Sequence, residues 1–248
     1  MAVWALADLH LSFGVPNKEM DVFGEQWHDH GTKIKERWLE RIAPTDLVLL
    51  AGDISWGMTP DQAKPDLDWI AALPGTKVLV KGNHDYWWSS LGKAQQVLQP
   101  SMHLIQNNTF MWNQIGIGGT RLWDTPEYGF SEYIPMKEYT TIKHTPVDEH
   151  QDDEKIFVRE LGRLENSLRA IPKHAAIRIA MTHYPPIGPD LKPTRATALL
   201  KKYGINVCVF GHLHGVIKDS LPFGELDGIR YIYTACDYVN FTPVKIFA

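Results

Sequence analysis

Five apolar segments, each rich in β-branched or aliphatic residues, run directly into short polar clusters. Apolar runs of this length are typical of buried strands, and segments with helical periodicity separate them. The predicted strands cover Val3 to Ala7, Leu47 to Ala51, Lys77 to Val80, Ile177 to Thr182 and Ile205 to Phe210. This alternation is typical of an α/β protein, in which ligands bind outside the carboxyl ends of the strands. We therefore expect the five polar clusters to meet at one edge of the fold.

Three other segments are weaker strand predictions, and five have the periodicity of helices. The weaker strands cover Met111 to Gly116, Ile229 to Thr234 and Val244 to Phe247. The helices are expected at Lys33 to Ile42, Asp61 to Leu73, Leu91 to Leu98, Lys155 to Ala170 and Thr194 to Tyr203. The sequence has no internal repeat or low-complexity segment, and we expect residues 1–248 to form a single domain.

The polar clusters supply side chains that are suited to binding transition metals. The candidate ligands are Asp8, His10, Asp53, Asn83, His183, His212 and His214. A mixed nitrogen and oxygen set without thiolates suits Mn, Fe, Zn, Co or Ni better than Ca or Mg. Seven ligands exceed the need of one ion that keeps a position open for water. They fit two ions about 3.5–4 Å apart that share one bridging carboxylate and a hydroxide.

The spacing within the clusters also fits a metal site. In Asp8-x-His10 and His212-x-His214, alternate side chains of an extended segment point the same way. Glycines precede Asp53, Asn83 and His212, and they allow the backbone to turn tightly beside an ion. Each short motif is weak evidence by itself, but their combination at successive strand ends indicates a specific site.

These clusters, in this order, resemble the sequence blocks of the calcineurin-like metallophosphoesterase superfamily. The matching blocks are Asp8-x-His10, Gly52-Asp53, Gly82-Asn83-His84-Asp85, Thr182-His183 and Gly211-His212-Leu213-His214. The resemblance extends from Asp8 to His214, and every block is intact. It implies a four-layer α/β (α+β) fold, in which helices flank two packed mixed β-sheets.

The resemblance also implies how the ligands divide between two ions. The first ion would be held by Asp8, His10, Asp53 and His214. The second would be held by Asn83, His183, His212 and the bridging Asp53. The histidine that follows the asparagine ligand, His84, would stay off the metal and face the substrate.

His84 and Asp85 are the candidate catalytic residues. A protonated His84 could stabilise the phosphoryl oxygens and protonate the leaving alkoxide. Asp85 could orient this imidazole, or alternatively it could simply close the turn. A hydroxide bridging the ions would attack phosphorus in line, so we expect no covalent phospho-enzyme.

Substrate-binding residues are harder to identify. His28 precedes a predicted helix in Trp27-His28-Asp29-His30, so we interpret it as a substrate-side or capping residue. Arg121 could clamp a phosphate in bidentate fashion or form a structural ion pair. The stretch 121–153 has no regular period and is expected to be a lid or cap insertion. Its aromatic residues could stack on a substrate or form a small core of their own.

Composition narrows the function classes. The net charge is −4 and no basic stripe is visible, which argues against a nucleic-acid partner. The chain has 2 cysteines, no signal-like start and no apolar stretch near the roughly 20 residues of a membrane span. We expect a cytoplasmic hydrolase of small phosphate mono- or diesters, including nucleotide-like ones. The alternatives are a non-catalytic metal-binding scaffold or a nuclease. The substrate, the native metals and the oligomeric state remain open.

Overall fold

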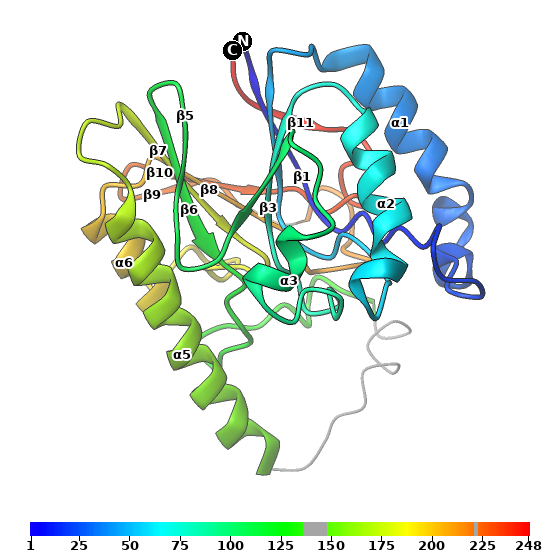
Figure 1. The fold of residues 1–248 in the computed structure, drawn as a ribbon. Helices are drawn as coiled ribbons and strands as arrows, with labels where there is room; N and C mark the ends of the chain where they lie inside the picture. Colours follow the sequence, from blue (N-terminus) through cyan, green and yellow to red (C-terminus); the bar gives the residue numbers. More distant parts are fainter. Residues whose placement is uncertain (136–147, 221–222) are drawn as a thin grey trace.

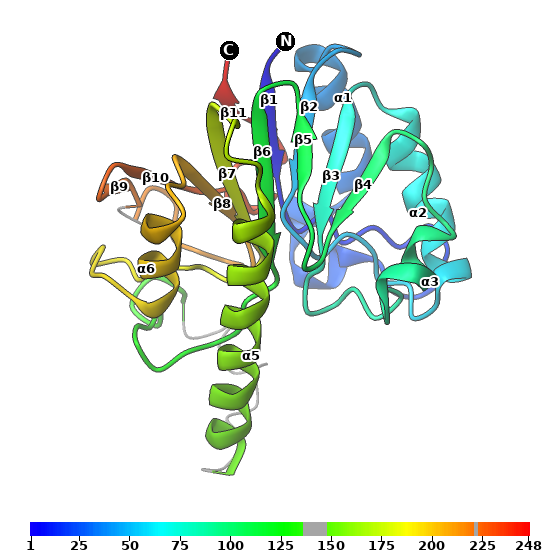
Figure 2. The same ribbon diagram turned by 60° about the vertical axis from the view of Figure 1, so that its left-hand side comes forward.

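Two β-sheets pack face to face, and helices cover the outer side of each (Figures 1 and 2). The computed structural model describes residues 1–135, 148–220 and 223–248. The layers follow the order helices, sheet, sheet, helices, which Figure 2 shows nearly edge on. The expected four-layer fold with two mixed sheets is therefore confirmed.

The first sheet has the strand order β11-β1-β2-β3-β4. The strands span Val244–Phe247 (β11), Val3–Leu6 (β1), Leu47–Leu50 (β2), Thr76–Val80 (β3) and Met102–Ile105 (β4). Strands β1 to β4 are mutually parallel, and β11 is antiparallel to β1. The carboxyl ends of the four parallel strands consequently lie at one edge of this sheet.

The second sheet has the strand order β5-β6-β7-β8-β10-β9. The strands span Phe110–Trp112 (β5), Ile115–Thr120 (β6), Ile177–Thr182 (β7), Val207–Phe210 (β8), Ile229–Tyr233 (β10) and Glu225–Leu226 (β9). Strands β6, β7, β8 and β10 are parallel, whereas β5 and β9 are antiparallel strands at the two ends of the sheet.

The helices divide between the two outer faces. The first sheet is covered by α1 (His30–Arg41), α2 (Pro60–Ala72) and α3 (Leu91–Gln95), and the second by α5 (Asp148–Ala170) and α6 (Arg195–Lys202). Two short 3-10 helices, η1 (Met20–Phe23) and η2 (Glu25–Trp27), precede α1. Helix α2 begins where Thr59 accepts a hydrogen bond from the Gln62 N–H, with Pro60 at its first position.

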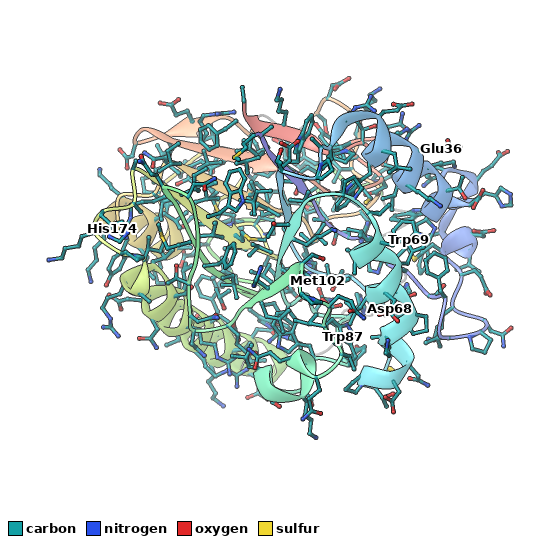
Figure 3. The ribbon with its side chains drawn as sticks, turned by 45° about the horizontal axis from the view of Figure 1, so that its top comes forward. Glu36, Asp68, Trp69, Trp87, Met102 and His174 are labelled. Atoms are coloured by element: carbon teal, nitrogen blue, oxygen red, sulfur yellow. The ribbon has the colours of Figure 1, made fainter. Side chains whose placement is uncertain are left out.

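Three hydrophobic cores hold the layers together. Small aliphatic residues such as Ala5, Leu49 and Val209 fill the space between the sheets. The two outer cores join each sheet to its helices and contain larger side chains. In Figure 3, Met102 and Trp87 lie in the interior, whereas Glu36 and His174 lie at the periphery. Because the central strands are buried on both faces, they appear in the sequence as continuous apolar runs.

Several predicted boundaries were wrong. The expected strand from Met111 to Gly116 is instead a hairpin, because β5 and β6 pair across a turn at Asn113, which has φ 53°. Strands β4 and β9 were not predicted. Helix α5 begins at Asp148 rather than at Lys155. Residues 136–147 of the predicted lid lie outside the described residues, and the lid remains a prediction.

Candidate metal centre

The predicted ligands meet at the edge where the parallel strands end. Backbone hydrogen bonds between successive loops set their positions: Asp8 N–H donates to the Gly52 carbonyl at 2.9 Å, and His10 N–H to the Asp53 carbonyl at 3.0 Å. In the second sheet, Gly211 N–H donates to the His183 carbonyl at 3.1 Å. The two sheets are connected here as well, because the His212 N–H donates to the carboxylate of Asp8, 204 residues away.

One group of side chains gathers around the end of β1. The Nε2 atoms of His10 and His214 are 3.0 Å apart. The Nε2 atom of His10 is 3.6 Å from Asp53 Oδ2, and that of His214 is 3.9 Å from Asp8 Oδ1. These four side chains are the set expected for the first ion.

A second group adjoins the first and shares one atom with it. The Nε2 atom of His183 is 2.7 Å from Asn83 Oδ1 and 3.4 Å from Asp53 Oδ2. The Nδ1 atom of His212 is 3.1 Å from the same Asn83 oxygen. Asp53 Oδ2 therefore lies between the two groups, which is the position required of a bridging ligand.

The protonation of these atoms indicates what the site can hold. The Nδ1 of His183 is 3.0 Å from the Ala51 carbonyl and can only donate to it, so a neutral ring has no proton on Nε2. That Nε2 lies 2.7 Å from the Asn83 amide oxygen, which also lacks a proton, so the contact is repulsive for a neutral ring and is relieved by a proton on Nε2 or by a metal ion bound to both atoms. Ligand atoms bound at about 2.0–2.2 Å to one transition metal are themselves roughly 3–3.4 Å apart. The residues present therefore fit a pair of such ions.

The buried charges also favour a cation at this site. Burial raises the pKa of the Asp8 carboxyl to about 7, and the nearby Asp53 carboxylate adds to the increase, although His214 and His183 oppose it. Burial tends to raise the pKa of Asp53 as well, but the His183 imidazole lowers it well below its usual range. For His183, burial lowers the pKa, but Asp53 outweighs burial and raises it to about 9. The cluster attracts positive charge, which a proton or a metal ion can supply.

Four of the candidate ligands have a left-handed backbone conformation. Asp8, His10, Asp53 and His212 have φ values of 59°, 45°, 50° and 78°. Non-glycine residues rarely adopt this left-handed conformation, which costs of order 1–3 kcal/mol per residue and is often found at functional sites. The sequence offers no sign of this strain, because none of the four positions is a glycine.

Two glycines beside the ligands are explained by close packing. A Cβ atom at Gly82 would overlap the backbone nitrogen and carboxylate of Asp53. A Cβ atom at Gly211 would overlap the carboxylate of Asp8. These glycines therefore allow neighbouring loops to approach the two carboxylates closely.

His84 lies beside the two groups. Its backbone N–H donates to Asp53 Oδ1 at 2.8 Å, and its ring lies 4.6 Å from the Trp56 ring and 5.8 Å from that of His10, measured between centroids. Its Nδ1 is buried and has no hydrogen-bond partner among the described residues. Burial lowers the pKa of His84, and the charge of Asp53 opposes this decrease. The protonated form that we expected remains a prediction.

Asp85 does not contact His84 through a hydrogen bond, contrary to the prediction that it orients this ring. Its carboxylate instead accepts hydrogen bonds from the N–H groups of Ile54, Ser55 and Gly82 and from the indole of Trp87. These donors are fixed by the loops after β2 and β3, so they occupy the carboxylate fully. Asp85 closes the turn and ties the Asp53 loop to the Asn83 loop, which was the alternative interpretation.

The two predicted substrate residues also have structural partners. The Arg121 guanidinium stacks over the Trp123 ring at 4.3 Å and lies 3.7 Å from Glu160 Oε1, so the ion-pair interpretation describes it. The Arg121 carbonyl accepts the N–H group of His183, which helps to position that ligand. His28 is largely exposed and pairs with Asp21 at 3.0 Å.

Aromatic residues of the 121–135 segment lie in two different surroundings, the outer core of the second sheet and the neighbourhood of a candidate ligand. Phe130 is buried in the outer core of the second sheet, and the Tyr128 hydroxyl donates to the Pro185 carbonyl at 2.5 Å. Trp123 instead stacks near Tyr184 at 5.1 Å, and Tyr184 stacks on His212 at 3.8 Å. The stacking therefore extends to a candidate ligand.

Sequence reasoning missed residues that support the ligands. Asp237 accepts hydrogen bonds from His214 Nδ1 at 3.3 Å and from the Gly215 N–H at 2.9 Å. Buried His30 is 3.0 Å from the Leu9 carbonyl, between two candidate ligands. Asp237 follows strand β10, so the strand-end rule that identified the other clusters could have identified it too.

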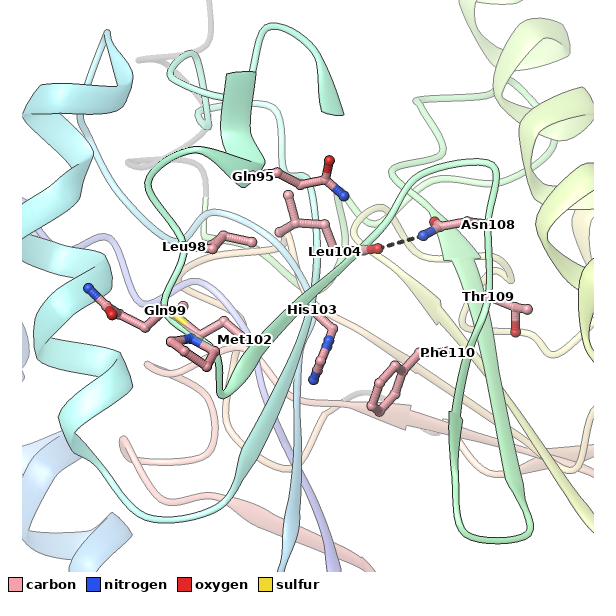
Figure 4. Close-up of a pocket in the computed structure, with 10 residues that line it drawn as sticks. Gln95, Leu98, Gln99, Met102, His103, Leu104, Asn108, Thr109 and Phe110 are labelled. Carbon is pink, nitrogen blue, oxygen red and sulfur yellow. Dashed lines mark hydrogen bonds between the residues drawn. The ribbon is translucent and has the colours of Figure 1, made fainter. Parts of the chain in front are cut away.

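A distinct cavity lies away from this centre. It has a volume of about 360 Å³ and adjoins β4, β5 and the end of α3 (Figure 4). In its lining, the ring of His103 stacks on Phe110 at 4.1 Å, and the Asn108 amide donates to the Leu104 carbonyl at 2.9 Å. None of the candidate ligands lines it.

A family profile described as calcineurin-like phosphoesterase matches residues 1–216, and the chain belongs to this family. Within the described residues, no helix has the length and apolar character needed to cross a membrane.

Two phage proteins match about a third of the chain. It is 37% identical to the Gene 66 protein of Mycobacterium phage D29 over 83 residues, 34% of this chain and 40% of that protein. It is 32% identical to the phage L5 Gene 66 protein over 84 residues, 33% of this chain and 39% of that protein. The phosphopantetheinyl hydrolase of Mycobacterium tuberculosis has a similar fold, with TM-score 0.55 and 13% identity over 99% of this chain and 95% of that one.

Proposed function

We propose that this protein hydrolyses small phosphate mono- or diesters, including nucleotide-like ones, with two transition-metal ions of the Mn, Fe, Zn, Co or Ni class. The observation that carries the proposal is the pair of ligand groups that share Asp53 Oδ2. One group is Asp8, His10, Asp53 and His214. The other is Asp53, Asn83, His183 and His212.

When bound, such an ion pair supplies an activated water and neutralises charge on the phosphoryl oxygens. The chain's own part is to fix the ligand geometry. The Ala51 carbonyl holds His183 with Nε2 directed at Asn83 and Asp53, and the backbone N–H of His212 holds the Asp8 carboxylate. His84 stands beside both groups without belonging to either, so its imidazole is the side chain proposed to face the substrate's reacting oxygens.

Flat side chains flank the proposed centre on two sides. Trp56 stacks on His10 at 5.0 Å with an interplanar angle of 25°, and Tyr184 stacks on His212. These two aromatic rings are compatible with a substrate that has a planar leaving group, such as an aryl group or a nucleobase. The mycobacterial protein of similar fold is a phosphopantetheinyl hydrolase, so phosphopantetheinyl compounds are further substrates to be tested. A cytoplasmic location remains a prediction.

The test is a paired assay of Mn²⁺-loaded protein on an aryl phosphomonoester and the matching bis-aryl phosphodiester. We expect the wild type to hydrolyse at least one substrate, and Asp53→Asn to lose at least about 100-fold in rate, since bridging ligands affect both ions. His84→Ala should lose about 10²–10⁴-fold while still binding metal. Metal binding without hydrolysis of either ester would favour the scaffold alternative. An unchanged rate in Asp53→Asn would refute the bridging role.

A further inference from the structure

Asp237 is a buried carboxylate beside the proposed metal centre. It follows strand β10, and its side chain is 7% exposed. Oδ1 lies 3.3 Å from His214 Nδ1, and Oδ2 accepts the Gly215 N–H at 2.9 Å. The carboxylate therefore contacts both the ring of His214 and the backbone that follows it.

These contacts fix the state of the His214 ring. A carboxylate can only accept at Nδ1, so this nitrogen carries a proton, and in the neutral ring that binds a metal the lone pair is on Nε2. Nε2 is the atom that lies 3.0 Å from His10 Nε2, within the first ligand group. A carboxylate on the far nitrogen of a ligand histidine holds the ring in place and makes the ligand nitrogen more basic.

The other ligand histidines are held differently. His183 Nδ1 is hydrogen-bonded to a neutral carbonyl, that of Ala51, and Asp8 lies farther away at 3.8 Å. His10 Nδ1 is buried without a hydrogen-bond partner in the described parts of the chain. His212 differs in another way, because its Nδ1 atom is the one that lies next to the Asn83 oxygen of the second group. The hydrogen bond from His214 to the Asp237 carboxylate therefore distinguishes the first ligand group from the second.

Negative charge is unequally divided as well. The first group contains the carboxylates of Asp8 and Asp53, and Asp237 stands directly behind it. The second group shares Asp53, while Asn83, His183 and His212 are neutral ligands when they bind a metal. Because ligand charge strengthens binding to a cation, the first group should hold its ion more tightly.

We propose that Asp237 is a positioning residue for His214 and makes the site of Asp8, His10, Asp53 and His214 the tighter of the two. This inference rests on the proposed function, because it presupposes that both sites bind metal. It assigns a role to a residue that lies beyond the matched family segment, which ends at residue 216.

Calorimetric titration of the metal-free full-length protein with Mn²⁺ tests the proposal. We expect two separate binding steps in the wild type. Asp237→Asn should weaken the tighter step by about 10–100-fold and leave the weaker step within about twofold. Asp190→Asn, which removes the same charge from an exposed position, is the matched control and should change neither step. Circular dichroism checks that each variant is folded.

A reciprocal variant keeps the test decisive if Asp237→Asn folds poorly. Asn83→Ala removes a ligand of the second group alone, so it should abolish the weaker step and preserve the tighter one. Two wild-type steps that Asp237→Asn leaves unchanged, or a tighter step lost in Asn83→Ala, would overturn the role of Asp237. Failure of the wild type to bind any of Mn²⁺, Fe²⁺, Zn²⁺, Co²⁺ and Ni²⁺ would instead overturn the proposed function itself.

Discussion

A single added methyl group at Gly82 should disturb the metal centre through Asp53. Gly82 does not have a positive φ, so alanine can adopt its backbone conformation without strain. The Cβ atom, however, would overlap the backbone nitrogen and the carboxylate oxygen of Asp53. The backbone nitrogen cannot rotate away as the end of a flexible side chain can. The loops that carry Asp53 and Asn83 must therefore separate.

The size of the effect follows from this overlap. Inserting a methyl group into a well-packed region typically costs about 1–3 kcal/mol. For a chain of this size, each kcal/mol corresponds to about 2–4 °C in melting temperature, so Gly82→Ala should melt about 2–12 °C lower in EDTA. Because Asp53 belongs to both ligand groups, Mn²⁺ binding should weaken at both sites.

The assay pairs thermal unfolding in EDTA with Mn²⁺ titration, and Gly92→Ala is the matched control. A Cβ atom at Gly92, in helix α3, meets no atom within 4 Å. Alanine is about 1 kcal/mol more favourable than glycine within a helix, so the control should melt at the same temperature or slightly higher. If Gly82→Ala bound Mn²⁺ like the wild type, the position assigned to Asp53 between the two groups would be wrong.

Two further predictions concern metal removal and pH. Chelation should lower the melting temperature, because ions bound only by the folded state stabilise that state. The stabilisation is about 2.7 kcal/mol when the free ion concentration is 100 times Kd. A melting curve of the Mn²⁺-loaded protein that EDTA does not change would contradict this prediction. Burial raises the pKa of Asp66 to about 6, although Ser55 and Phe13 donate hydrogen bonds to it. The folded state therefore holds this proton more tightly than the unfolded state. The resulting stabilisation is complete below the unfolded pKa, near 4, and is lost as pH rises through about 6. Urea unfolding across this range should show that decline, and Asp66→Asn should reduce it; identical slopes in the two proteins would count against the assignment.

The segments that supply the ligands could be identified without any coordinates. Strands buried on both faces must be continuously apolar, and polar residues can begin only where such strands end. Because the parallel strands of a sheet end at a common edge, separate clusters such as Asp8-x-His10 and Gly82-Asn83 could be assigned to one site. The same rule applied to β10 would have indicated Asp237, but that strand was predicted only weakly.

The pairing of polar groups within that site required the folded arrangement of the two sheets. Asp85 could orient a histidine or close a turn, and four donors fixed by neighbouring loops determine that it closes the turn. Arg121 could bind phosphate or form an ion pair, and the position of helix α5 places Glu160 beside it. Such outcomes depend on distances between residues far apart in the chain, as in the contact from His212 to Asp8 across 204 positions. Local sequence sets which side chains reach the site, whereas the packing of the two sheets sets which atoms meet there.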